Sequence, residues 1–291
     1  MAFQSIESLL EASRELPLWE VVRREDCRDS ALSEEDSTQK MTQLWEAMEA
    51  TQRDYDPFRR SQSGLVGGDG ARLEREGPGL CDPFLREVIS RALKAGECNA
   101  CMRRVVAAPT AGASGVLPAV LIPLQRREKY SREKMVEALY VAAGFGQIIA
   151  LRASISGAEG GCQAEVGSAS AMAAAALTYL KGGSPEQMAH GCALALANTL
   201  GLVCDPVGGL VEVPCVTRNV MGAVNALSCA ELALSGVESR IPCDEVIDAM
   251  GAVGALLPPS LRETGQGGLA ATPTGRRLAE SREKGGEAEC E

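Results

Sequence analysis

Alanine-rich segments with helical periodicity alternate with glycine-rich connectors from about residue 105 to residue 256, and this pattern limits the folds open to the chain. Ser184-Pro185 and Pro242 suit helix starts, and Gly182-Gly183 suits a helix end. No stretch shows the period-2 alternation of a β-strand. The sequence therefore predicts an all-α fold. The expected helices in this region are 131–153, 164–181, 185–202, 217–236 and 243–256.

The first 60 residues are polar and charged, yet they carry the same helical spacing. Met41, Leu44, Trp45 and Met48 fall at i, i+3, i+4 and i+7, which favours an amphipathic helix packed on a core. We expect residues 1–60 to form a helical outer layer. The segments expected after it are a glycine-rich loop at 61–82 and a helix from Pro83.

The composition fits one helical domain built of small side chains. Apolar residues make up 45% of the 291-residue chain but aromatic residues only 3%, so alanine, leucine, valine and glycine must fill the core. We expect a single domain at 1–275. Residues 276–291 are charged and poor in apolar residues, so we expect them to form a flexible tail.

Charge and targeting signals exclude several classes of protein. The net charge of −10 argues against a nucleic-acid partner, because no basic surplus exists to neutralise phosphates. The start "MAFQSIESLLEASREL" lacks the basic and continuous apolar regions of a signal peptide, so we expect a cytoplasmic protein. The uncharged run 105–125 reaches membrane-spanning length, but prolines and glycines interrupt it, which favours buried turns and short helices over a membrane contact.

Three of the eleven cysteines share an unusual placement. In the cytoplasm thiols stay reduced, so the cysteines are expected to be buried small residues, metal ligands or both. Cys162, Cys204 and Cys215 lie where glycine-rich connectors meet helices, whereas Cys192 and Cys229 lie within helix faces. A helix N-terminus favours the thiolate, which is the metal-binding form. Packing in the core remains the alternative interpretation.

The stretch "GLVCDPVGGLVEVPCVTRN" (201–219) leaves one helix and returns to the next, so its two cysteines can meet. Three thiolates suit a cubane iron–sulfur cluster with one iron free of protein sulfur, which can act as a Lewis acid. Structural zinc usually takes four ligands with a close pair, and the pair Cys98-x-x-Cys101 stands alone and could be redox-active or inert. For the sole histidine, His190, a capping or core role is favoured over metal ligation.

The connector "APTAGASGVLP" (108–118) is a candidate anion site. Its small residues let successive backbone N–H groups point into one concavity, and the hydroxyls of Thr110 and Ser114 could add donors for a carboxylate or phosphate. A turn between buried helices is the alternative.

Together, "APTAGASGVLPAVL", "SGAEGGCQAEVGSASAMAAAAL" and "GLVCDPVGGLVEVPCVTRN" closely resemble the α chain of iron–sulfur-dependent L-serine dehydratases. The resemblance includes "SGLVGGDG" and "GLAATPTGRRL" and runs from about residue 60 to 275. It implies that Cys162, Cys204 and Cys215 bind a [4Fe–4S] cluster. The implied reaction converts L-serine to pyruvate and ammonia, and its base is not identified.

The implied mechanism needs a pocket for the substrate carboxylate. The 110–115 loop is the expected place, and the candidate contacts there are Thr110, Ser114 and Gly115. Arg218 and Asn219, next to Cys215, are further candidates, with a surface role at a helix start as the alternative. Pyridoxal phosphate is not expected, because none of the six lysines lies inside the apolar glycine-rich core.

The resemblance also implies a partner. Members of the family exist as one chain or as separate α and β chains, and no segment here resembles the β portion. We therefore expect a hetero-oligomer with a β chain, acting on L-serine. Cys290, in the tail, could contact the open iron when substrate is absent. Two alternatives remain: a related lyase acting on cysteine or threonine, and a non-catalytic α-like scaffold.

Overall fold

The structure, a computed structural model, describes residues 3–77 and 79–287, and within them the chain is all-α as predicted. The only β contact in this part of the chain is an isolated bridge between Cys204 and Arg262. The α-helices are α1 (Ile6–Ala12), α2 (Leu18–Ser30), α3 (Glu34–Arg53), α4 (Asp69–Arg75), α5 (Pro83–Ala100), α6 (Val116–Glu128), α7 (Arg132–Ala153), α8 (Gly157–Gly160), α9 (Ser168–Leu180), α10 (Pro185–Ala197), α11 (Cys215–Leu234), α12 (Cys243–Leu256) and α13 (Pro273–Glu287).

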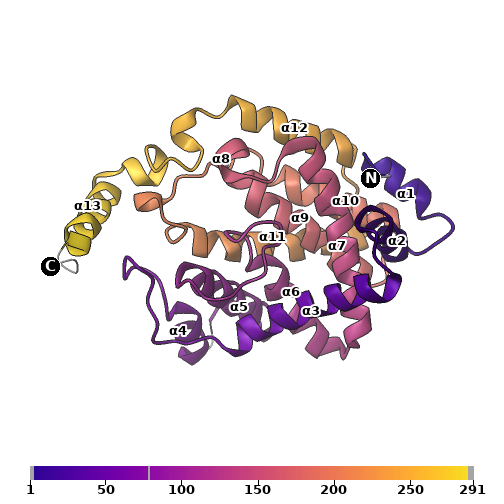
Figure 1. The fold of residues 1–291 in the computed structure, drawn as a ribbon, viewed down its shortest axis with the longest axis horizontal. Coiled ribbons are helices and arrows are strands. Elements are labelled where there is room, and N and C mark those ends of the chain that lie inside the picture. Colours follow the sequence, from indigo (N-terminus) through magenta and orange to yellow (C-terminus); the bar gives the residue numbers. More distant parts are fainter. Residues whose placement is uncertain (1–2, 78, 288–291) are drawn as a thin grey trace.

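Helix α9 forms the centre of the molecule and is surrounded by α6, α7, α10 and α11 (Figure 1). Almost all of its residues are buried, as expected of a helix that is apolar on every side. Small residues let the neighbouring helices approach closely. A Cβ added to Gly146 of α7 would lie 2.7 Å from the Met172 sulfur, and one added to Gly222 of α11 would lie 2.7 Å from Val166.

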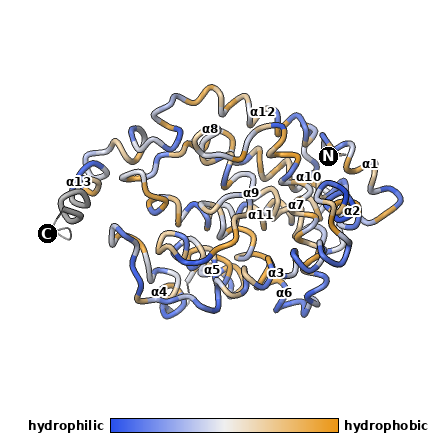
Figure 2. Tube along the Cα trace, viewed as in Figure 1, coloured by the Kyte–Doolittle hydropathy of each residue, from blue (hydrophilic) through white to orange (hydrophobic). Residues whose placement is uncertain are grey.

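The N-terminal helices α1–α3 cover one side of this core, and the division of the chain into a domain at 1–275 and a tail stays a prediction. Helices α2 and α3 pack on α7, and hydrophilic residues predominate in α2 (Figure 2). Trp45 and Met48 are buried, and Met41 packs against the core. Leu44 is 45% exposed, so the apolar face of α3 is narrower than its spacing predicts.

Two apolar segments have the length of a membrane span, and both are core elements here. The run 105–125 breaks into a turn and the buried helix α6, as expected. Among the described helices, α7 alone is long enough and apolar enough to cross a membrane. It packs against α2 and α9, and 67% of its most apolar window is buried, which is typical of a core helix.

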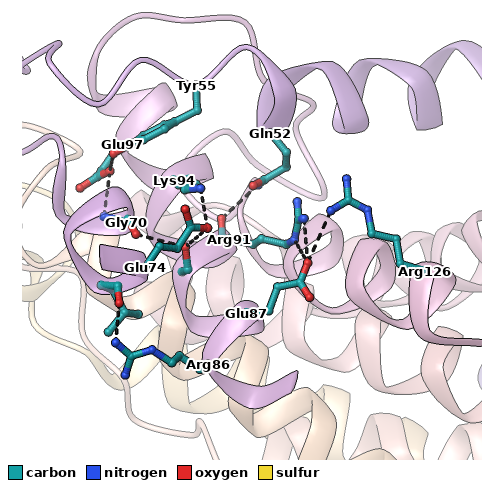
Figure 3. Close-up of polar contacts among 12 residues, drawn as sticks. Gln52, Tyr55, Gly70, Glu74, Arg86, Glu87, Arg91, Lys94, Glu97 and Arg126 are labelled. Atoms are coloured by element: carbon teal, nitrogen blue, oxygen red, sulfur yellow. Dashed lines mark hydrogen bonds and ion pairs between the residues drawn. The ribbon is translucent and has the colours of Figure 1, made fainter. Parts of the chain in front are cut away.

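Two helices, α4 and α13, form where the sequence predicted a glycine-rich loop and a tail. Residues 69–75, within the expected loop, form α4 because Glu97 of α5 accepts hydrogen bonds from the Asp69 and Gly70 N–H groups at its start (2.7 and 3.4 Å; Figure 3). Helix α13 extends away from the body of the molecule and includes most of the expected tail (Figure 1). The flexibility of that segment stays a prediction.

Candidate active site

Three connectors bring Cys162, Cys204 and Cys215 together. Cys162 follows α8, Cys204 lies in the segment after α10, and Cys215 is the first residue of α11. Cys162 and Cys204 are buried and Cys215 is partly buried, and all three are free thiols. Burial raises the pKa of Cys204, and the charges of Cys162 and Cys215 raise it further, so the three sulfurs lie within electrostatic reach of one another.

The other two thiols are shifted in the same direction. Burial raises the pKa of Cys162 to about 11 and that of Cys215 to about 12. Within residues 3–77 and 79–287, no three His, Cys, Asp or Glu side chains converge closely enough to hold a single metal ion.

Glycines allow the chain to pack closely around Cys204. A Cβ added to Gly157 would lie 3.3 Å from the Cys204 sulfur and 2.7 Å from Oε2 of Glu165. Gly161 has a φ of +77°, and a Cβ there would lie 2.9 Å from the Leu202 carbonyl oxygen. The turn before Cys162 can therefore approach the Cys204 segment only because these positions carry no side chain.

The C-terminal part of the chain holds Cys204 in place. Cys204 donates its N–H to the Leu261 carbonyl (2.9 Å), and its own carbonyl accepts from the Glu263 N–H (2.8 Å). The next residue, Asp205, is buried and accepts from the Leu269 N–H (2.7 Å). The motif "GLAATPTGRRL" is thus part of the framework of the site, although it lies more than fifty residues after Cys204.

Arg218 links the cysteine segments electrostatically. Its guanidinium donates to the Val203 carbonyl (2.8 Å) and to Oδ1 of Asp205 (2.7 Å), and its side chain is only 14% exposed. It also lies beside the Cys162 sulfur, where its positive charge opposes the rise that burial causes in the pKa of that thiol. Arg218, a candidate substrate contact from the sequence, thus has protein partners in the structure.

Asn219 ties the 110–115 loop to the helix of Cys215. Its side-chain amide donates to the Gly112 carbonyl (2.8 Å) and the Cys215 carbonyl (3.0 Å), and its oxygen accepts from the Gly115 N–H (2.8 Å). The Asn219 side chain and the Gly115 N–H therefore already have hydrogen-bond partners within the protein. As direct contacts of substrate, Asn219 and Gly115 stay predictions.

The hydroxyls of Thr110 and Ser114 are buried without a well-formed hydrogen bond. The Thr110 hydroxyl lies near the Glu165 carboxyl and lowers its pKa, but the geometry of a full hydrogen bond is not met. Most buried polar groups have a partner, and leaving one without a partner costs about 1–3 kcal/mol. Two such hydroxyls on one loop indicate a place where a polar ligand can bind.

Glu165 is the site residue that sequence reasoning missed. Its carboxyl lies between the 110–112 loop, Gly157 and Cys204: a Cβ on Gly112 would be 3.5 Å from Oε1. Burial raises the pKa of Glu165 and the charge of Glu263 adds to the rise, while Thr110 opposes it. Its place three residues after Cys162, one helical turn away, is the signal that could have identified it.

The remaining cysteines and the histidine lie elsewhere. Cys192 and Cys229 are fully buried in the core, as predicted. Burial raises the pKa of both Cys98 and Cys101, so neither is a reactive thiolate at neutral pH. His190 lines a cleft between α1, α10 and the start of α12. Cys290 lies outside the described residues.

Comparison with known proteins gives the class. The family model "Serine dehydratase alpha chain" matches residues 13–270, and the chain therefore belongs to that family. It is 48% identical over 281 residues to the probable L-serine dehydratase, alpha chain, of Bacillus subtilis, covering 95% of this chain and 94% of that one. It is 40% identical over 274 residues to the L-serine dehydratase, alpha chain, of Peptoniphilus asaccharolyticus, covering 91% and 92%.

A third relative has a longer chain than this protein. The L-serine dehydratase TdcG of Escherichia coli is 44% identical over 181 residues, which are 62% of this chain but only 40% of that protein. The resemblance found in the sequence motifs is thus confirmed at the level of the family.

Proposed function

We propose that this protein is the catalytic α chain of an L-serine dehydratase, which converts L-serine to pyruvate and ammonia with a [4Fe–4S] cluster bound to Cys162, Cys204 and Cys215. One observation supports this most strongly: three free thiols from three separate connectors, two of them buried and one partly buried, lie within electrostatic reach of one another and of the Glu165 carboxyl, which the Thr110 hydroxyl approaches from the 110–115 loop. We further propose a β chain as partner and the cytoplasm, where thiols stay reduced, as the compartment.

The donor set fits such a cluster. Cys₃ ligation is suited to a cubane with one open iron, and Gly157 puts no side chain against the Cys204 sulfur. Arg218 is a buried cation next to Cys162, where it offsets the charge of the thiolates. When bound, the cluster supplies a Lewis acid that makes the β-hydroxyl of serine a better leaving group.

The residues of the chain supply binding and proton transfer. The Thr110 and Ser114 hydroxyls donate to the substrate carboxylate, which gives both hydroxyls the partner that they lack. The Glu165 carboxylate accepts the Cα proton, because it is the acceptor that faces the space between this loop and Cys204. Loss of that proton and of the β-hydroxide gives an enamine, whose imine tautomer is hydrolysed to pyruvate and ammonia. Asn219 and Arg218 hold the loop and the cysteine segments in position.

The test is anaerobic reconstitution with iron and sulfide, with and without the β chain, followed by visible absorbance and a pyruvate assay. Single replacement of Cys162, Cys204 or Cys215 by serine should abolish both the colour and the turnover. Cys229→Ser is the matched control, since Cys229 is a buried free thiol that lies in the core, and it should keep both. Colourless wild-type protein, or turnover of cysteine or threonine in preference to serine, would contradict the proposal.

A further inference from the structure

Large apolar side chains and arginines are exposed together where the 55–68 loop meets the end of α5. Phe58 is 83% exposed, Met102 88% and Leu65 42%. We refer to these side chains, with four exposed arginines, as the arginine–apolar surface. Its members are Phe58, Leu65, Met102, Arg59, Arg60, Arg103 and Arg104.

The two segments are held against each other. Arg103 donates to the Asp54 carbonyl (3.1 Å), and Tyr55 donates to the buried carboxylate of Glu97, which also binds the start of α4 (Figure 3). The loop closes on itself through a hydrogen bond from the Ser61 N–H to the Val66 carbonyl (2.9 Å). A small hollow lies between the segments, lined by Tyr55, Asp56, Arg59, Gly67, Glu97, Cys98, Cys101 and Arg103.

Among the described residues, the hydrogen bonds found for the guanidinium groups of this surface go to backbone carbonyls and not to carboxylates. Arg60 donates only to the Pro57 and Arg59 carbonyls (3.1 Å each), and Arg103 only to a backbone carbonyl. Within the described part of the chain, none of the four forms an ion pair with a carboxylate. In a protein of net charge −10, four such arginines around exposed apolar side chains complement an acidic partner.

The surface is continuous with the cysteine site. Glu212, between Cys204 and Cys215, is buried and accepts hydrogen bonds from the Ser61 hydroxyl (2.7 Å), the Ser63 N–H (3.4 Å) and the Ser63 hydroxyl. On the same loop, Val66 packs with Val216, the residue after Cys215. A partner bound to the surface would therefore hold the loop that supports two of the three cysteines.

We propose that the arginine–apolar surface is the docking site of the β chain, through a patch of apolar side chains ringed by Asp and Glu. The inference rests on the proposed function, because the partner is the one that an α chain requires. The match to the L-serine dehydratase TdcG of Escherichia coli agrees with a missing partner, because this chain matches only 40% of that protein and most of it lies outside the matched part. Exposed aromatic, methionine and arginine side chains are the types enriched at the centre of protein interfaces.

The test measures the dissociation constant of the β chain of the same organism from three reconstituted variants. Phe58→Ser/Met102→Ser should weaken binding about 30-fold or more, since truncated interface anchors cost about 1–2 kcal/mol each. Arg59→Glu/Arg104→Glu should weaken it as strongly at low salt and reduce its salt dependence. The control Arg240→Glu/Ile241→Ser changes an exposed arginine and an exposed isoleucine in the loop before α12 and should stay within about twofold of wild type.

The binding results can be told apart from the results that test the proposed function. Absorbance of the cluster and thermal unfolding of the isolated α chain should be unchanged in all variants, because the altered side chains lie outside the cysteine site. If both double variants bind the β chain like wild type, or if they abolish only self-association of the α chain, the docking proposal is wrong. Weakened binding together with a wild-type complex that makes no pyruvate would support the docking site and refute the proposed activity.

Discussion

Replacing Asn219 with alanine should destabilise the protein and its cysteine site together. Asn219 is 1% exposed, and two hydrogen bonds of its side chain join α11 to the 110–115 loop, while a third goes to the Cys215 carbonyl at the start of α11. The substitution leaves the buried Gly115 N–H and the partly buried Gly112 carbonyl without partners. The Cys215 carbonyl keeps its backbone bond within the helix. At about 1–3 kcal/mol for each group, two such losses predict a destabilisation of about 3 kcal/mol.

This change is measurable by two independent methods. For a chain of this size, about 3 kcal/mol corresponds to a fall in Tm of roughly 6–12 °C in a thermal melt. Iron bound per chain after anaerobic reconstitution should also fall, because Cys215 loses its tie to the loop. The control is Asn99→Ala in α5, where no hydrogen bond of the side chain is found among the described residues, and it should change the free energy of unfolding by less than about 0.5 kcal/mol. A Tm within about 2 °C of wild type for Asn219→Ala would refute the reasoning.

Three further substitutions test the site and its surroundings. Gly157→Ala places a Cβ 2.7 Å from Glu165 and 3.3 Å from the Cys204 sulfur, and a clash of roughly 1.4 kcal/mol would weaken iron binding about tenfold, so iron bound per chain should fall. Gly77→Ala, in open space, should bind iron normally. Glu165→Gln should lower kcat about 10²–10⁴-fold with iron content unchanged. The control Glu159→Gln, at an exposed position, should match wild type. Full turnover by the Glu165→Gln variant would exclude Glu165 as the proton acceptor. Burial raises the pKa of Glu74, but hydrogen bonds from Lys94 and Ser90 lower it by more. The stabilisation is therefore present above the unfolded glutamate pKa of about 4.3 and is lost as the pH falls through the lower folded pKa. Glu74→Gln should cost under about 1 kcal/mol in urea unfolding at pH 7 and less than that at pH 3.

Several local features could be predicted because their causes lie within a few residues. Ser184 forms a capping box with Gln187, and Pro185 occupies the first turn of α10, as its sequence signal indicates. Gly182 adopts a φ of +80° after α9, where the glycine pair predicted the helix end. The placement of Cys162 and Cys215 beside helix starts could likewise be inferred from the chain on either side of them.

Other features could not be predicted because their partners are distant in sequence. Helix α4 depends on Glu97, 28 residues after Asp69, for its N-terminal hydrogen bonds. Sequence spacing made Leu44 a core residue, yet packing leaves it half-exposed, because α7 covers only part of α3. The sequence did not point to Glu165, the proposed proton acceptor, because a glutamate inside a helical pattern is ordinarily a solvated residue. Only the fold turns Glu165 toward the Cys204 segment.

The sequence by itself determined that the chain is helical, where most helices begin, and that three cysteines lie at junctions with glycine-rich connectors. The tertiary structure decided which groups meet at those junctions. Asn219 reaches Gly112 across 107 positions, and Asp205 reaches Leu269 across 64. The physical reason is range: caps and helical hydrogen bonds act within about four residues, whereas the partner of a buried polar side chain is set by how whole helices pack.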